Sequence, residues 1–139
     1  MSHSSSAPEL PDGSRNAVLG DLPSAGTACG IGRRFVAAQL RGWQVDESIV
    51  EVAVLITSEL VANAVNHAPP PGHLQVSLDG RRVRIEVTDA SPLPPEIVSP
   101  GALATGGRGL LLIGRLASGW GWEPQAPGKV VWCEVILPA

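Results

Sequence analysis

The sequence of 139 residues has few cysteines and no large excess of one charge, and each shortage excludes a class of protein. Its two cysteines, Cys29 and Cys133, lie far apart and belong to no Cys/His spacing that binds zinc. Neither a zinc site nor a disulfide framework is expected, and we predict buried free thiols. The net charge is −3 and the basic residues form no long run. Nucleic acid is therefore not an expected partner.

Long apolar runs and two common motifs are also missing. No apolar run approaches the roughly eighteen residues that span a bilayer, and the N-terminus lacks a basic and then apolar signal pattern. We therefore expect a soluble, cytoplasmic protein that does not enter a membrane. The phosphate-binding pattern GxxxxGK[ST] is absent, which argues against an ordinary P-loop NTPase. There is also no room for a histidine-kinase phosphoacceptor domain.

The length of the chain suits one domain with its own core. Residues 1–15 are rich in serine and proline and have few apolar anchors, so we predict a disordered N-terminal segment. Residues 16–139 would then form the folded domain, beginning with a short apolar stretch at 16–22.

Apolar residues at helical spacing predict two helices in the first half of the chain. The first would begin at a Ser24 N-cap and end at Gly42. The second and longest would begin at an Asp46 N-cap and end at His67, because prolines 69–71 follow.

Alternating apolar and polar residues predict a hairpin after these helices. Residues 74–78 and 83–87 alternate with a period of two and are joined through Asp79-Gly80, a dipeptide suited to a tight turn. The two strands would pair antiparallel.

The second half of the chain repeats this pattern after a proline-rich connection. A glycine-rich stretch at 104–109 leads into an apolar segment at 110–116, which we predict to be a short helix. Residues 120–122 and 129–137 alternate again and predict a second hairpin. The order helix, helix, hairpin, helix, hairpin predicts an α+β fold, a two-layer sandwich.

Four polar residues share one face of the predicted long helix. Relative to Glu59, Asn63 lies about 40° away, Asn66 about 20° the other way and His67 about 80°, at roughly 100° per residue. One interpretation is a solvated polar stripe on an amphipathic helix. The other is the lining of a cleft, because the intervening residues are apolar. Carboxylate and carboxamide oxygens in a cleft suit magnesium, which shares its ligands with substrate phosphates.

Three motifs in order resemble the GHKL (histidine kinase-like) ATPase/kinase superfamily. They are ELVANAVNH at residues 59–67, Asp89-Ala90-Ser91, and GRGL at residues 107–110. Within the superfamily, the chain resembles the bacterial anti-sigma regulatory factor serine/threonine kinases. The resemblance covers roughly residues 17–137. It implies a Bergerat-type ATP-binding fold, with a mixed, mostly antiparallel sheet covered by helices on one face.

The resemblance also implies roles for residues on the long helix and at the end of a strand. Asn63 would chelate the Mg²⁺ that bridges the phosphates of ATP, and Glu59 would be the general base. Asp89 would accept a hydrogen bond from the exocyclic amino group of adenine. Asn66 and His67 would lie near the phosphates, although His67 could equally cap the helix end.

The glycine-rich motif would hold phosphate. Gly106, Gly107 and Gly109 allow the backbone to approach anionic oxygens, and a helix beginning at Leu110 would offer free N–H groups. Arg108 would add a charge-assisted contact. The alternative for this cluster is a plain flexible loop.

Two positions depart from the superfamily pattern. Ser91 stands where glycine is typical, which alters the backbone approach to the base, although the serine hydroxyl could donate a hydrogen bond. Val130 stands where the superfamily commonly places a threonine that helps to hold adenine. Adenine would then depend more on Asp89.

The resemblance implies the following function and partners. The protein would be an ATP-binding anti-sigma factor with protein serine/threonine kinase activity. It would sequester a sigma factor and phosphorylate a serine of an anti-anti-sigma (STAS-type) protein, and it would be a homodimer. The alternative is a nucleotide-binding regulatory module that binds a sigma factor or another regulator without phosphoryl transfer. A third reading is a degenerate scaffold that has lost nucleotide.

Overall fold

A computed structural model describes residues 14–23, 27–67, 72–94 and 117–138 of the chain. Four predictions lie outside these residues: the disordered segment, apart from its last two residues, the Ser24 N-cap, the glycine-rich stretch at 104–109, and the short helix at 110–116.

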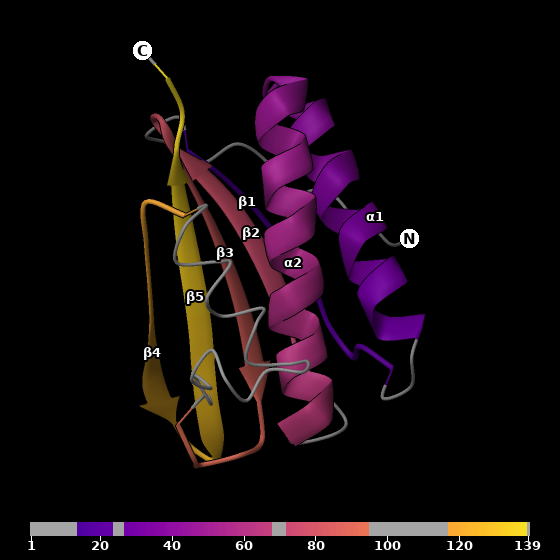
Figure 1. The fold of residues 1–139 in the computed structure, drawn as a ribbon, viewed down its shortest axis with the longest axis vertical. Helices are drawn as coiled ribbons and strands as arrows, with labels where there is room; N and C mark the ends of the chain where they lie inside the picture. Colours follow the sequence, from indigo (N-terminus) through magenta and orange to yellow (C-terminus); the bar gives the residue numbers. More distant parts are fainter. Residues whose placement is uncertain (1–13, 24–26, 68–71, 95–116, 139) are drawn as a thin grey trace, which may run out of the picture.

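The described residues form two layers, a five-stranded sheet and a pair of helices (Figure 1). The helices are α1 (Thr27–Gly42) and α2 (Glu47–His67). The strands are β1 (Arg15–Leu19), β2 (Leu74–Asp79), β3 (Arg82–Asp89), β4 (Gly119–Gln125) and β5 (Gly128–Ile136). Their order is β1-β2-β3-β5-β4, with every pair antiparallel. The predicted α+β class with helices on one face of a mostly antiparallel sheet is confirmed.

The first element is a strand, whereas the sequence predicted that a helix would come first. Arg15–Leu19 pairs with β2, and Ala17 lies opposite Val76 with both side chains buried. The next side chain, Val18, points to the other face and is 42% exposed. Five residues with one buried apolar side chain carry too little alternation to predict a strand, so the partner β2 decides this conformation.

Both helices form where the spacing of apolar residues predicted them. Asp46 caps α2, because its Oδ2 accepts a hydrogen bond from the backbone N–H of Ser48 at 3.1 Å. The helices pack closely at Gly32, where an added Cβ would lie 3.2 Å from Leu74 Cδ2 and 3.3 Å from Val61 Cγ2. α1 packs over β1 and β2, and α2 packs over β3 and β5, so the core lies between the layers.

One sequence expectation about membranes needs correction. Residues 47–65 of α2 are, by length and composition alone, apolar enough to cross a bilayer. In the structure, however, one stripe of this helix is fully buried against α1 and the sheet, at Val50, Ala53, Ile56 and Val61. A buried core helix meets the same criterion, and the buried stripe of α2 belongs to the core.

Both predicted hairpins form. Asp79-Gly80 connects β2 to β3, and Gly80 has a positive φ of 63°, which glycine adopts without strain. β4 and β5 form the second hairpin. Both cysteines are free; Cys133 is fully buried in the core, while Cys29 is partly exposed. Burial raises the pKa of the Cys133 thiol to about 12.

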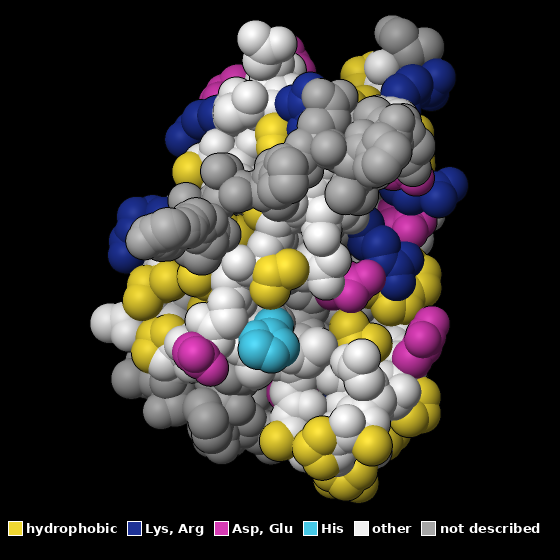
Figure 2. Space-filling model, turned by 180° about the vertical axis from the view of Figure 1, so that it is seen from behind, with side chains coloured by type: hydrophobic (Ala, Val, Ile, Leu, Met, Phe, Trp, Pro, Cys, Tyr) yellow, Lys and Arg dark blue, Asp and Glu magenta, His cyan; other side chains and the backbone are white. Residues whose placement is uncertain are grey.

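The sheet face turned away from the helices is polar. Arg84 lies at its centre, with Nε 2.6 Å from Glu86 Oε2 and Nη1 2.8 Å from Glu134 Oε2. Its guanidinium also lies over the Trp132 ring, 4.4 Å from the centroid. Figure 2, the view from behind, shows basic and acidic side chains beside one another along the sheet.

Candidate functional site

Two of the three motifs lie within the described residues, and the fold brings them to one end of the molecule. The C-terminal end of α2, the end of β3 and the start of β5 lie together there (Figure 1). α2 packs on both of these strands. Glu59 and Asn63 belong to the C-terminal half of α2, and Asp89 is the last residue of β3.

Asp89 is buried and held by two hydrogen bonds. Its side chain is 2% exposed. Oδ1 accepts one bond from the backbone N–H of Ser91 at 2.9 Å and another from Lys129 Nζ at 3.1 Å. Both bonds reach the same oxygen, and no described residue donates to Oδ2. The carboxylate therefore has a fixed orientation and one oxygen with acceptor capacity to spare.

Ser91 supports Asp89 through its backbone. The N–H that bonds to Asp89 would be present in any residue except proline, so glycine is not required for this contact. The hydroxyl of Ser91 accepts a hydrogen bond from the backbone N–H of Leu93 at 3.2 Å and so orders the start of the following loop. Replacing the typical glycine by serine thus leaves the support of Asp89 intact.

Lys129 is a site residue that the sequence interpretation missed. It lies directly opposite Asp89 in the register of β3 and β5, and its side chain is only 1% exposed. Val130, by contrast, pairs with Thr88 and points to the other face of the sheet. Its missing hydroxyl therefore has no bearing on Asp89. The alternation of buried Val131, Cys133 and Val135 could have revealed that Lys129 points inward.

Gly128 determines how closely β5 passes this carboxylate. A Cβ on Gly128 would lie 1.9 Å from the carbonyl oxygen of Asp89 and 2.7 Å from Ala90 C and Cα. A side chain would collide with backbone, which cannot rotate away. Glycine at this position lets Lys129 reach Asp89.

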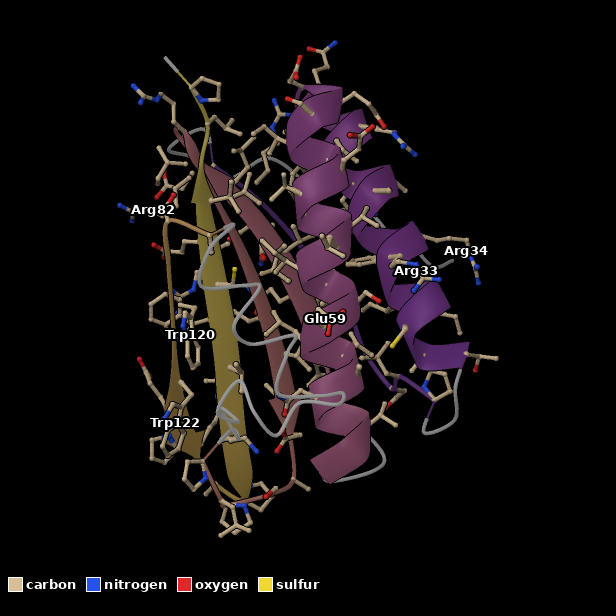
Figure 3. The ribbon with its side chains drawn as sticks, viewed as in Figure 1. Arg33, Arg34, Glu59, Arg82, Trp120 and Trp122 are labelled. Carbon is tan, nitrogen blue, oxygen red and sulfur yellow. The ribbon has the colours of Figure 1, made fainter. Side chains whose placement is uncertain are left out.

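Glu59 and Asn63 lie one turn apart on the partly buried rim of α2, next to the buried Leu60 and Ala64. Figure 3 shows Glu59 projecting from the helix. Among the described residues, none forms a hydrogen bond or ion pair with either side chain. Within the described part of the chain, their oxygens are therefore open to a ligand.

The described residues could bind Mg²⁺ only together with oxygen ligands from a substrate. No group of three or more His, Cys, Asp or Glu side chains in the described ranges could hold a metal ion. Mg²⁺ commonly binds through one or two protein oxygens together with substrate phosphates and water, which is compatible with Asn63 and Glu59.

The remaining predicted site residues cannot be placed. Asn66 and His67 belong to the last turn of α2, but their side chains are outside the described part of the structure. Gly106, Gly107, Arg108, Gly109 and Leu110 also lie outside the described residues.

A hollow of about 500 Å³ lies on the face of the sheet away from the helices. It is lined by Gln75, Glu86 and Thr88 and reaches the sheet end at Asp89 and Lys129. Neither Glu59 nor Asn63 lines it. Since Glu59 and Asn63 lie on α2, on the other side of the sheet, this hollow is not the cleft that the polar stripe predicted.

Comparison with protein families decides the superfamily. The family model for the histidine kinase-like ATPase domain matches residues 23–134, which include α1, α2 and the strands that carry Asp89 and Lys129. The chain belongs to the histidine kinase-like ATPase family. A search of curated proteins finds no match.

Membership of the histidine kinase-like ATPase family indicates which kind of ligand the domain binds. Domains of this family bind ATP, usually together with Mg²⁺. The predicted superfamily and the ATP-binding character are thereby supported. The narrower prediction, an anti-sigma serine kinase, goes beyond this comparison. β1 lies before the matched range, so the edge strand that the sequence did not predict is also outside the matched part of the family.

Proposed function

We propose that this histidine kinase-like ATPase is an anti-sigma factor with protein serine kinase activity. It would sequester a sigma factor and transfer the γ-phosphoryl group of ATP to a serine of an anti-anti-sigma partner. The observation that carries the nucleotide part is the fixed, buried Asp89, whose Oδ2 receives no hydrogen bond from the described residues. The sigma factor, the anti-anti-sigma partner, the homodimer and the cytoplasmic location rest on the sequence resemblance.

In this proposal each site residue has one task. Asp89 accepts a hydrogen bond from the amino group of adenine. Asn63 would hold Mg²⁺ together with the phosphates, and the ion would supply positive charge beside the transferred group. Glu59 accepts the proton of the attacking serine hydroxyl while the oxygen of that serine bonds to phosphorus and ADP leaves. The oxygens of Glu59 and Asn63, one turn apart on α2 and without a partner among the described residues, support these tasks.

Calorimetric titration with ATP and ADP, with and without Mg²⁺, tests the nucleotide part. We expect Mg²⁺-dependent binding to the wild type, loss of binding in Asp89→Ala and weaker binding in Asn63→Ala. Asp79→Ala is the control for Asp89, because Asp79 is an exposed carboxylate at the far end of the same hairpin. Circular dichroism must show that each variant is folded. A wild type that binds neither nucleotide would refute the proposal.

Transfer of labelled phosphate to candidate anti-anti-sigma proteins tests the kinase part. We expect Glu59→Gln to slow transfer by about 10²- to 10⁴-fold, the usual contribution of a general base. Glu51→Gln is the matched control, since Glu51 is an exposed carboxylate two turns earlier on α2. A Glu59→Gln protein that phosphorylates its partner as fast as the wild type would show that Glu59 is not the base.

One observation favours the second candidate, a nucleotide-binding regulatory module without phosphoryl transfer. The Lys129 ammonium already engages Asp89 Oδ1, so this acceptor carries an internal cation before any nucleotide binds. A carboxylate that is already paired with a cation can keep the ligand-free site folded, as a module that only binds nucleotide requires. ATP binding by the wild type without transfer to any partner serine would favour this candidate, and transfer would exclude it.

A further inference from the structure

The Lys129 ammonium has unused hydrogen-bonding capacity in a buried position. Its side chain is 1% exposed, yet the described residues supply a single acceptor, Asp89 Oδ1 at 3.1 Å. An ammonium group has three N–H donors, and a buried charge is costly unless its hydrogen bonds are satisfied. The group is therefore poised to donate to a further acceptor, from water or from a ligand.

The same pair has a neighbouring acceptor that no described residue engages. Asp89 Oδ2 receives no hydrogen bond from the described part of the chain, while Oδ1 is occupied by Ser91 and Lys129. Donor and acceptor groups thus stand side by side, held by the register in which Asp89 faces Lys129. A ligand that matches this pair must present an adjacent donor and acceptor in the opposite order.

Adenine presents such an edge, with the N6 amino donor beside the N1 acceptor. We propose that Lys129 donates a hydrogen bond to N1 of adenine while Asp89 accepts one from the amino group, so that the pair selects adenine among purines. The proposal rests on the proposed ATP site and adds to it a specificity-determining residue. Reading of a base through its Watson–Crick edge by paired polar groups is a general mode of recognition.

The same geometry rejects a 6-oxo purine. Hypoxanthine places O6 where adenine has its amino group and N1–H where adenine has an unprotonated nitrogen. In the adenine orientation, O6 would face the Asp89 carboxylate and N1–H would face the Lys129 ammonium. Two acceptors would then face each other, and so would two donors, and such unpaired buried polar groups discriminate strongly against the wrong base. A purely structural ion pair would show no such dependence on the ring nitrogen.

Titration of the wild type with base-modified nucleotides tests the proposal without any substitution. We expect 1-deaza-ATP, which lacks only N1, to bind about 10- to 100-fold more weakly than ATP, the usual effect of losing a hydrogen bond to a charged group. The control is 7-deaza-ATP, which lacks a ring nitrogen outside the Watson–Crick edge and should bind nearly as well as ATP. ITP should bind more weakly than 1-deaza-ATP.

Substitution of Lys129 tests whether this residue causes the preference for ATP over 1-deaza-ATP. In Lys129→Met, ATP and 1-deaza-ATP should bind equally, because the donor to N1 is gone. Arg82→Met is the matched control: it removes a cation at the opposite end of β3 and should keep the preference for ATP (Figure 3). If Lys129→Met does not fold, the wild-type titrations still decide the question.

Two outcomes would overturn the inference, and they are distinguishable. Equal binding of ATP and 1-deaza-ATP by the wild type would show that Lys129 does not contact N1, while leaving the ATP site itself intact. Failure of the wild type to bind ATP at all would refute the proposed function and this inference together.

Discussion

Gly128 and Asp89 are in backbone contact so close that a Cβ on the glycine would stand 1.9 Å from the aspartate carbonyl oxygen. This contact joins the start of β5 to the end of β3 and sets the position from which Lys129 reaches the carboxylate. Placement of a buried charge pair therefore depends on a residue that has no side chain.

The contact predicts a large effect of Gly128→Ala. The added methyl meets backbone atoms, which must shift, so we expect a loss of roughly 2 kcal/mol or more in the free energy of unfolding. Urea denaturation measures this loss. Gly119→Ala is the matched control, because apart from the adjoining residues no described atom lies within 4 Å of its Cβ position on β4. Similar stabilities for the two variants would contradict the geometry.

The buried ion pair predicts that substituting the second partner partly reverses the loss of stability caused by substituting the first. Asp89→Asn leaves the Lys129 ammonium buried without a countercharge, which typically costs about 3–5 kcal/mol. Adding Lys129→Met removes that uncompensated charge, so the double variant should be more stable than Asp89→Asn alone. Thermal and urea unfolding of the variants form the measurement. Purely additive losses would mean that the two groups are not coupled.

Burial of Cys133 predicts a specific dependence on alkaline pH. Its thiol pKa is raised from 9.0 to about 12, chiefly by burial and secondly by the nearby Glu134 carboxylate. Between these values the unfolded chain loses the thiol proton and the folded chain keeps it. Stability must therefore fall as pH rises through this window, by up to about 1.4 kcal/mol per pH unit.

Unfolding measured at several pH values checks this effect, with Cys133→Val as the reference that lacks the thiol. The wild type should lose stability more steeply above pH 9 than this variant. Alkylation provides a second readout: at pH 8 the reagent should label the partly exposed Cys29 and spare Cys133. Equal labelling of both cysteines in the native protein would contradict the burial.

The N-cap of α2 predicts an effect at acid pH. Hydrogen bonds from the hydroxyl and the backbone N–H of Ser48 lower the pKa of Asp46. The cap therefore stabilises the helix above the ordinary pKa of an aspartate, and this stability is lost as pH falls through the lowered value. Asp46→Ala should lower the urea midpoint at neutral pH, whereas Asp46→Asn should retain most of the cap. Equal midpoints for alanine and wild type would rule out the cap.

Local patterns in the sequence predicted most of the described elements. Apolar spacing and the Asp46 cap predicted the two helices, and alternation with Asp79-Gly80 predicted the first hairpin. These elements depend on residues close in the chain, which explains why local reasoning succeeds. The polar stripe at Glu59 and Asn63 was likewise predicted from helical geometry alone.

The edge strand β1 was not predicted, for a physical reason. Its five residues contain one fully buried apolar side chain, Ala17, and its conformation follows from pairing with β2, about sixty residues later. Strand formation of this kind depends on a distant partner.

The sequence by itself determined the helices, the hairpins and the kinds of residue that the site contains, because those features arise from neighbouring residues. Only the tertiary structure decided that Lys129, and not Val130, meets Asp89, since the register between β3 and β5 joins residues forty positions apart. A buried charge is tolerated in the core only when a partner of opposite charge is buried beside it. Folding of the sheet brings them together, and that pairing determines the hydrogen-bonding groups that the proposed site would offer to a base.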